Sequence, residues 1–411
     1  MRGFAACRPL GEHVREVACP PSDEVDEDAG RALIAESARS FLRVTRPELD
    51  LPAIHAYEGE YRHRKAAARF RALIDEGVLV EDRAPHLYLY EQRLGEHRQM
   101  GLVACVPVKD FVFGSLKGHK QVREEQIVDR MEHIEHLRAH DEPVLLGYRA
   151  DADVDAIVNH AARGKPSCSF EGADGVEHSV WVLDPDSRQA VSERLAVHVR
   201  RSEAAPALYV LHGQHLCSAA IRVHQRLRGS RGEDDVFLAL LVPHTQIKLA
   251  AYRRLVRDYE RRGPQVLLEK LRGLLDLTAV ADSSAARPRA HGSVGLYLAG
   301  QWYAGRLPEG GGSVRDPVEA LDCSQCDAKV LAPLFAVPGS REEKHLEFVA
   351  GDRPTSELEA QVDSGEFVMA VRLFPPSVEQ VFAVSDANRS MPRRSYSLAL
   401  KPASGLFVHT F

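Results

Sequence analysis

The stretch Leu208-Tyr209-Val210-Leu211-His212-Gly213-Gln214-His215-Leu216-Cys217-Ser218-Ala219-Ala220 decides which fold and which chemistry to expect. Its first half is an apolar run typical of a buried strand, and its second half begins a helix. Between them, Gly213 allows the backbone to turn tightly and to approach a ligand. The first N–H groups of a helix have no partner within the helix and carry the positive end of its dipole. The sequence therefore predicts an anion site, suited to phosphate, where the strand turns into the helix.

Strands and helices alternate on both sides of this turn. Periodic apolar positions predict helices over 29–44, 58–76, 122–139, 154–162 and 190–199. Apolar runs predict strands over 78–80, 87–90, 100–108, 143–148, 179–183, 236–242 and 247–256, and the last two look like adjacent strands. We expect an α+β fold in which a mixed-sheet core holds the Gly213 turn.

The length of 411 residues suits two or three packed units. Residues 281–293 are rich in small, turn-forming residues and lack a buried-face period, so they are the best boundary candidate. We expect an α+β core over 1–280, a linker over 281–293, and a β-rich α+β C-terminal portion over 294–411 that is able to complete the pocket.

Composition narrows the class of protein. The chain is 44% hydrophobic and 27% charged, which is ordinary for a soluble globular protein. A formal net charge of −6, without Lys and Arg runs interleaved with aromatic residues, disfavours nucleic-acid binding. No segment approaches the roughly 20 apolar residues that span a bilayer. Seven scattered cysteines and no signal peptide predict reduced thiols in the cytoplasm.

Further motifs are spread over nearly the whole chain. They are Ser40-Phe41-Leu42-Arg43-Val44-Thr45-Arg46-Pro47-Glu48, Gly101-Leu102-Val103-Ala104-Cys105, Asp129-Arg130, Asp174-Gly175-Val176 with Trp181, Met391-Pro392-Arg393-Arg394-Ser395 and Ser404-Gly405-Leu406. On these residues the chain resembles the domain of unknown function (DUF) 1015 family, distant relatives of the ParB/sulfiredoxin-like free-serine kinases. The resemblance implies a ParB/sulfiredoxin-like mixed-sheet core and a nucleotide-dependent kinase that acts on a small, serine-like hydroxyl compound.

The chain departs from the family at the turn itself. Family members carry Asp-Gly-His-His-Arg there, whereas this chain has His212, Gln214 and Leu216 at the Asp, first His and Arg positions. Gly213 and His215 are retained. His212 can accept a proton near neutral pH, but an imidazole is a poor substitute for Asp as an oxygen ligand of Mg²⁺.

Other signatures of the family are also altered. Lys120 stands where the family has a carboxylate, and the family's Pro-Pro-Tyr-Asp is Pro20-Pro21-Ser22-Asp23 here. The family's Met-Pro-Pro-Lys-Ser-Thr is Met391-Pro392-Arg393-Arg394-Ser395-Tyr396. Whether activity survives these substitutions is open at this point.

The candidate site follows from what phosphoryl transfer needs. Such a site positions donor and acceptor and neutralises charge with glycine-loop N–H groups, Arg or Lys, usually Mg²⁺, and a carboxylate near the attacking hydroxyl. The catalytic candidates are His212, His215 and Asp23, and the candidates for binding the nucleotide phosphates are Gly213, Gln214, Arg394, Ser395 and Lys401.

Each candidate also has a purely structural interpretation. Gly213 can be a tight strand-to-helix connection, His215 a surface or capping residue, and Asp23 the cap of the following helix. Arg394 and Lys401 can be solvated basic residues.

Two hypotheses follow. The first is a small-molecule kinase that uses ATP or ADP, with Mg²⁺ as an accompanying metal and a small-molecule substrate as its partner. The second is a pseudoenzyme, a non-catalytic ParB-like module that binds a nucleotide or another ligand. The substrate, the preferred nucleotide and the oligomeric state are not readable from these residues.

Overall fold

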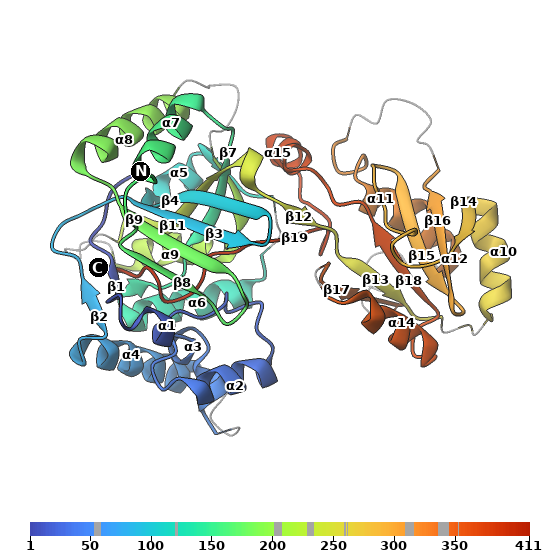
Figure 1. Cartoon of the computed structure of the whole chain (residues 1–411), viewed down its shortest axis with the longest axis horizontal. Helices are drawn as coiled ribbons and strands as arrows, with labels where there is room; N and C mark the ends of the chain where they lie inside the picture. The colour runs from blue at the N-terminus through green and yellow to red at the C-terminus, as the bar shows by residue number, and fades with distance from the viewer. Residues whose placement is uncertain are drawn as a thin grey trace. The chain divides into compact units, whose positions relative to one another are not determined.

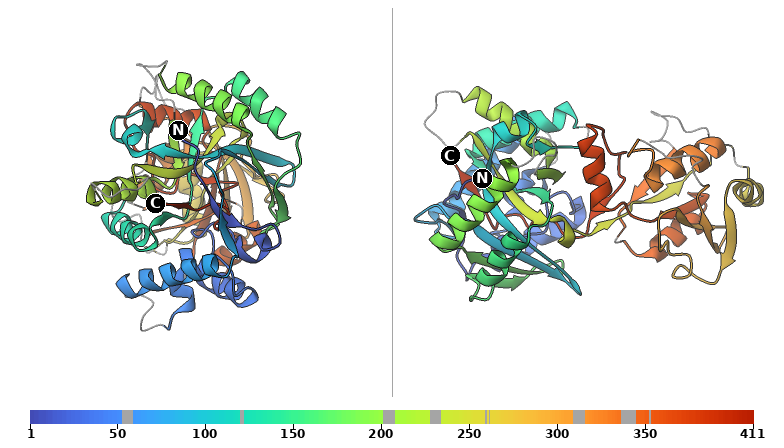
Figure 2. Two further views of the ribbon diagram at one scale, coloured as in Figure 1. Left: turned by 90° about the vertical axis from the view of Figure 1, so that its left-hand side faces the viewer. Right: turned by 90° about the horizontal axis from the view of Figure 1, so that it is seen from above.

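The computed structural model describes residues 1–52, 59–119, 122–200, 208–227, 234–258, 260, 262–308, 316–335, 345–351 and 353–411. The chain forms two compact units, the first from residues 1–247 and 400–411 and the second from residues 248–399. The two chain termini therefore belong to the same unit (Figure 1, Figure 2). The second unit is inserted in the sequence of the first.

The first unit is built on a mixed sheet, which has eight strands among the described residues. Their order is β5 (Leu116–Lys117), β10 (Leu208–His212), β7 (Val144–Tyr148), β11 (Val236–Pro243), β4 (His97–Pro107), β3 (Tyr88–Leu94), β9 (Glu177–Val182) and β8 (Cys168–Glu171). Two pairs are parallel, β10 with β5 and β11 with β7, and the others are antiparallel. Every residue of β11 is buried, as expected for a central strand covered on both faces.

Helices pack around this sheet in two groups. They are α5 (Val108–Val112), α6 (Glu124–Leu137), α7 (Ala152–Ala161), α8 (Pro185–Arg200) and α9 (Gln214–Arg226). Figure 1 shows α7 beside α8, and α6 packs against α9 through Ile127, Met131 and Val223. Four of the five predicted helices each correspond to one helix, whereas residues 29–44, predicted as one helix, form α2 and α3 with a break after Glu36. The α6–α9 contact fixes the start of α9 relative to charged residues of α6.

The N-terminal residues form a second core in the same unit. Its elements are β1 (Cys7–Pro9), α1 (Val14–Val17), α2 (Glu27–Glu36), α3 (Leu42–Thr45), η1 (Pro47–Asp50), α4 (Gly59–Asp75), β2 (Leu79–Glu81) and β6 (Ala139–His140). The returning chain joins this core, because β20 (His409–Thr410) pairs with β6 and Val408 is buried in the cluster. Residues 400–411 are thus an integral part of the first unit.

The second unit is built on an antiparallel sheet, with six strands among the described residues. Their order is β14 (Asp276–Val280), β16 (Gln301–Arg306), β15 (Ser293–Leu298), β18 (Met369–Leu373), β13 (Arg253–Val256) and β17 (Leu346–Val349). The other elements are η2 (His244–Gln246), which precedes the unit, and β12 (Leu249–Ala250), α10 (Pro264–Leu274), α11 (Asp322–Cys326), η3 (Asp327–Leu331), α12 (Ala332–Phe335), α14 (Thr355–Asp363), α15 (Val378–Asp386) and β19 (Ser397–Leu398). Leu255, Trp302 and Phe367 lie in its core cluster.

Two expectations from the sequence differ from this arrangement. Residues 236–242 and 247–256 were expected as adjacent strands, but β11 lies between β7 and β4 in the first unit whereas β13 lies between β18 and β17 in the second. Residues 281–293 were expected to be a linker between 1–280 and 294–411, but they connect β14 to β15 within the second unit. Ala286 there is buried in the unit's core, and a Cβ at Gly295 of β15 would clash with its carbonyl oxygen, so the segment packs closely on that strand. None of the described helices combines the length and the apolar character needed to cross a membrane.

Candidate functional site

The turn between β10 and α9 has the geometry that the sequence predicts. Gly213 adopts φ 84° and ψ 25°, a left-handed conformation that disfavours other residues. Its carbonyl accepts hydrogen bonds from the N–H groups of Leu216 (2.9 Å) and Cys217 (3.3 Å), which begin the helix. A Cβ at this position would lie 3.2 Å from Leu216 Cδ1. The strand, the turn and the helix expected over 208–220 are therefore confirmed.

Gln214 has a structural contact at the start of α9. Its Oε1 accepts a hydrogen bond from the His119 N–H (3.1 Å), and its side chain lies directly against Gly118, just after β5. The residue thus ties the segment after β5 to the first turn of the helix. Lys120, which stands where the family has a carboxylate, lies outside the described residues.

A small cavity lies at the start of α9. Its volume is about 40 Å³. Because one buried water needs about 10–15 Å³, the cavity holds about three water molecules, which is close to the size of one phosphoryl group. All the residues around it belong to the first unit. They are Pro21, Ser22, Asp23, Arg130, Glu142, Pro143, His212, His215, Leu216, Lys401 and Pro402. Four of the predicted site residues, Asp23, His212, His215 and Lys401, therefore line one cavity.

Asp23 is held between two basic side chains. Lys401 Nζ lies 2.7 Å from Asp23 Oδ2 and 3.0 Å from Glu24 Oε1, and His212 Nε2 lies 3.8 Å from Asp23 Oδ1. Partial burial alone would raise the pKa of Asp23, but the charges of His212 and Lys401 lower it to about 2. The same carboxylates raise the pKa of Lys401 above its ordinary value, against the effect of burial. The lysine is a permanent cation and Asp23 a permanent anion at neutral pH.

The structural alternative for Asp23 does not apply. The helix that follows it, α2, is capped by Asp26, whose side chain accepts a hydrogen bond from the Ala29 N–H (2.8 Å). Asp23 precedes this cap and faces the cavity instead.

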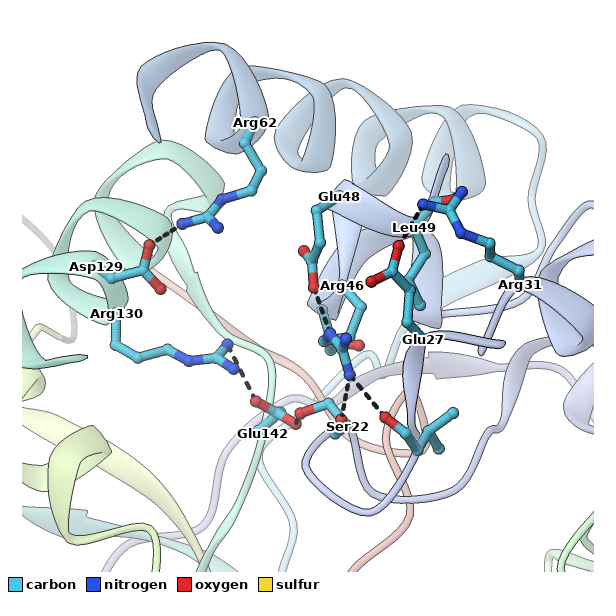
Figure 3. A network of polar contacts seen from close by, with 12 residues as sticks. Ser22, Glu27, Arg31, Arg46, Glu48, Leu49, Arg62, Asp129, Arg130 and Glu142 are labelled. Carbon is cyan, nitrogen blue, oxygen red and sulfur yellow. Dashed lines mark hydrogen bonds and ion pairs between the residues drawn. The ribbon is translucent and has the colours of Figure 1, made fainter. Parts of the chain in front are cut away.

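Three other residues that line the cavity are not among those predicted for the site from the sequence: Ser22, Arg130 and Glu142. Arg130 Nη1 lies 3.2 Å from Glu142 Oε2, and the Ser22 hydroxyl donates a 2.5 Å hydrogen bond to Glu142 Oε1 (Figure 3). Ser404 Oγ also donates to Glu142 Oε1, over 3.3 Å. Burial raises the pKa of Glu142, although the charge of Arg130 opposes that effect.

The sheet pairing explains why Glu142 is at the site. Strand β10 runs antiparallel to β7, with His212 opposite Leu145, so the end of β10 lies beside the start of β7. Glu142 lies two residues before β7 and lines the same cavity as His212 and His215. The Asp129-Arg130 pair was visible as a family marker, but its role at the cavity depends on the packing of α6 against α9.

The structure does not bring Arg394 and Ser395 to this cavity. Both belong to the second unit, where the Arg394 guanidinium lies 5.6 Å from the centre of the Phe348 ring and Ser395 is buried. Of the C-terminal basic candidates, Lys401 alone is among the residues that line the described cavity. Among the residues that the structure describes, no group of three or more His, Cys, Asp or Glu side chains is arranged to hold a metal ion.

Several solved structures resemble the chain. A free serine kinase in complex with AMP has a TM-score of 0.34 at 12% identity and covers 74% of this chain and 92% of its own. SbnI with a C-terminal truncation, from Staphylococcus aureus, has a TM-score of 0.36 at 12% identity, with 75% and 87% covered. A conserved hypothetical protein from Pyrococcus furiosus has a TM-score of 0.33 at 12% identity, with 74% and 95% covered.

No curated protein matches the chain. The model of the family described as "Protein of unknown function (DUF1015)" matches residues 1–324, well over half of the sequence. This span includes the Gly213 turn and every cavity residue except Lys401 and Pro402. The chain therefore belongs to the DUF1015 family.

Proposed function

We propose that the first unit is a nucleotide-dependent phosphotransferase that transfers a phosphoryl group to a small hydroxyl compound. One observation carries this proposal: a cavity of phosphoryl size at the start of α9 is lined by the cations Arg130 and Lys401 and by the carboxylates Asp23 and Glu142. Phosphoryl transfer needs both kinds of group, since one neutralises the phosphate and the other receives the proton of the attacking hydroxyl.

The basic side of the cavity suits a phosphate. The positive end of the α9 dipole, Lys401 and Arg130 come together there, and His215 in the first turn adds a further donor. A volume of about 40 Å³ accommodates one phosphoryl group, so the nucleoside of ATP or ADP would lie outside the cavity.

The acidic side compensates for the altered family motif. His212 stands where the family has Asp, but Asp23 and Glu142 line the same cavity from other segments. Mg²⁺ is usually held by one or two carboxylates together with phosphate oxygens and water. Asp23, with its pKa of about 2 and a side chain 47% exposed, fits that role.

The remaining features of the proposal concern the fold and the setting. We assign the mixed sheet and the strand–Gly213–helix turn of the first unit to the ParB/sulfiredoxin-like type. None of the seven cysteines, all of which lie in the described residues, forms a disulfide, which supports a reducing compartment such as the cytoplasm. The acidic balance of the chain supports a small molecule, rather than a nucleic acid, as its partner.

A second candidate function is a pseudoenzyme that binds a nucleotide without catalysis. It is favoured by the contact of Gln214 with His119, by Leu216 in place of the family's Arg, and by the neutralisation of Lys401 by Asp23 and Glu24. In that case the cavity binds the phosphate but transfers nothing.

A thermal-shift series with ADP, ATP and CTP, with and without Mg²⁺, followed by product analysis with L-serine and other small alcohols, separates the two functions. A kinase is stabilised by a nucleotide and consumes it only when a hydroxyl compound is present. A pseudoenzyme is stabilised but forms no product. No shift with any nucleotide would contradict both.

The variant Lys401→Met sharpens this test. Loss of a charged hydrogen bond to phosphate costs about 1.5–3 kcal/mol, so we expect the nucleotide Kd to rise about 10-fold to 100-fold. Arg257→Met, at a cavity of the second unit, is the matched control and should leave the Kd unchanged.

A further inference from the structure

The Ser22 hydroxyl occupies a distinctive position in the cavity of the first unit. Ser22 lines the cavity, is 4% exposed, and donates a 2.5 Å hydrogen bond to Glu142 Oε1. The hydroxyl therefore lies beside both the proposed phosphate position and a carboxylate.

The carboxylate is itself held in place by a third group. Arg130 Nη1 lies 3.2 Å from Glu142 Oε2, while Oε1 accepts hydrogen bonds from the hydroxyls of Ser22 and Ser404 (Figure 3). A hydroxyl bonded to a base, with the base oriented by another side chain, is the usual arrangement of an activated nucleophile. Here the three groups are Ser22, Glu142 and Arg130.

The backbone around Ser22 is also fixed. Arg46 Nη1 donates to the carbonyl oxygens of Ser22 (2.9 Å) and Val25 (2.9 Å), and the same guanidinium forms an ion pair with Glu48 (Figure 3). The hydroxyl is thus presented to the cavity by a constrained segment, as positioning of a nucleophile requires.

The two carboxylates of the cavity differ as bases. Burial raises the pKa of Glu142, whereas the pKa of Asp23, which burial alone would raise, is lowered to about 2 by the neighbouring His212 and Lys401 side chains. A general base works best when its pKa lies near the working pH, so Glu142 is the better proton acceptor of the two. Asp23 is better suited to neutralising a cation.

We propose that Ser22 is a phosphoryl acceptor, with Glu142 as its base. The proposal rests on the proposed function, since it takes the phosphoryl group from a nucleoside di- or triphosphate bound at the cavity. Ser22 Oγ forms a bond to the terminal phosphorus, and the bond from that phosphorus to its bridging oxygen breaks. The shortened nucleotide leaves with the electron pair, and the Ser22 proton passes to Glu142 Oε1. The phosphoryl group then occupies the cavity near Lys401 and the start of α9.

The test incubates the full chain with Mg²⁺ and either ATP labelled in its γ-phosphoryl group or ADP labelled in its β-phosphoryl group. We expect label in the protein, a mass increase of one phosphoryl group, and Ser22 as the modified residue in peptide mapping. Ser22→Ala should abolish the label, whereas Ser22→Thr, which keeps a hydroxyl, should retain a part of it. Glu142→Gln keeps the size of the side chain and should lower the labelling rate at least 100-fold, within the range typical of general-base loss.

A matched control distinguishes chemistry from loss of packing. Ser40 is as buried as Ser22, at 4% exposed, and is not among the residues that line the cavity, so Ser40→Ala should be labelled like the natural chain. Binding of ATP or ADP is measured for each variant by thermal shift. Nucleotide binding without label, or label that survives in Ser22→Ala, would overturn the role of Ser22 and leave the proposed function standing. Absence of nucleotide binding by the natural chain would overturn both.

Discussion

The two units each contain a cavity, and the smaller one holds the more reactive set of groups. The cavity of the second unit has a volume of about 580 Å³, compared with about 40 Å³ in the first. Its basic residue, Arg257, is neutralised by Glu347 (3.1 Å) and Glu366 (2.7 Å), and its guanidinium lies 4.0 Å from the centre of the Phe367 ring. By volume alone, the second cavity would be the better candidate for a functional site. The environment of the ionisable groups favours the first cavity instead.

The difference lies in how far the acids are from water. Glu347 and Glu366 are 44% and 57% exposed, whereas Glu142 is 14% exposed. An exposed ion pair contributes little because water solvates both partners, but a largely buried carboxylate depends on its counter-charge. Similar arginine–glutamate pairs should therefore behave differently in the two units.

The largest expected effect comes from removing that counter-charge. Arg130→Ala leaves Glu142 without its cation, and we expect a loss of about 3–5 kcal/mol in the free energy of unfolding of the first unit. Arg257→Ala should cost about 1 kcal/mol or less in the second. Urea unfolding followed by hydrogen exchange measures each unit separately. The Arg130→Ala loss should be smaller at pH 5 than at pH 8, because Glu142 can then take up a proton, and equal losses for the two variants would remove the distinction between the cavities.

The second-largest expected effect is that mild acid lowers the stability of the first unit more than that of the second. Burial, with the charge of His409, lowers the pKa of His140 to about 3, and burial lowers the pKa of His178 to about 4. Both are neutral in the folded first unit, whereas in the unfolded chain they take up protons below about pH 6.5. Their stabilising contribution is therefore complete above pH 6.5 and is lost as the pH falls, by about 1 kcal/mol each at pH 5.5.

The second unit provides the internal control for this pH effect. Its two histidines are not buried, since His291 is exposed and His345 is half-buried. Hydrogen exchange at pH 7.5 and pH 5.5, corrected for intrinsic rates, should thus show weaker protection in the first unit only. Burial also lowers the pKa of His63 in the first unit, so His140→Gln should remove only a part of the pH dependence, and an unchanged dependence would assign it to other groups.

Substitution of either of two glycines with similar φ angles should have a smaller effect on stability. Gly213 has φ 84° and Gly365, which lines the second cavity, has φ 81°. Alanine in a left-handed conformation costs about 1–2 kcal/mol in either place. A Cβ at position 213 would also lie 3.2 Å from Leu216 Cδ1, whereas nothing lies within 4 Å of one at position 365. We expect Gly213→Ala to lower the urea midpoint more than Gly365→Ala, and the reverse order would show that the Leu216 contact is readily relieved.

Removing the second unit is expected to have the smallest effect on the stability of the first unit. The core clusters of the two units share no residues, and the Ala399 N–H donates to the Lys248 carbonyl over 2.9 Å, so the ends of the insertion are adjacent. Replacing residues 249–398 with a short Gly-Ser linker closes a small loop at little entropic cost. The first unit should remain folded, with its stability changed by less than about 1 kcal/mol. An unfolded or aggregated product would mean that the first unit depends on the second.

Local features of this fold were predictable from sequence, and long-range pairings were not. The Gly213 turn and helix α4, predicted over 58–76, depend on backbone conformation and on a short apolar period. The separation of β11 from β13 depends instead on which strands pair, and the segment after β11, which begins His244-Thr245, carries no signal for a change of unit.

The candidate site shows the same division. His212, Gly213 and His215 could be named because they are neighbours in one motif, whereas Glu142 reaches the cavity only through the antiparallel pairing of β7 with β10. Arg394 was named for its charge, but its place in the second unit depends on contacts that the sequence does not reveal.

The return of residues 400–411 to the first unit has a consequence for how the protein is made. A ribosome must synthesise all of the second unit before Lys401 and β20 emerge, so the nascent first unit waits with an unfinished cavity and an unpaired β6. A stop codon or frameshift anywhere within residues 248–399 would remove that closing segment, even though most of the first unit had already been translated. Truncating mutations far along the gene can therefore disable a site whose other residues were all encoded upstream of the second unit.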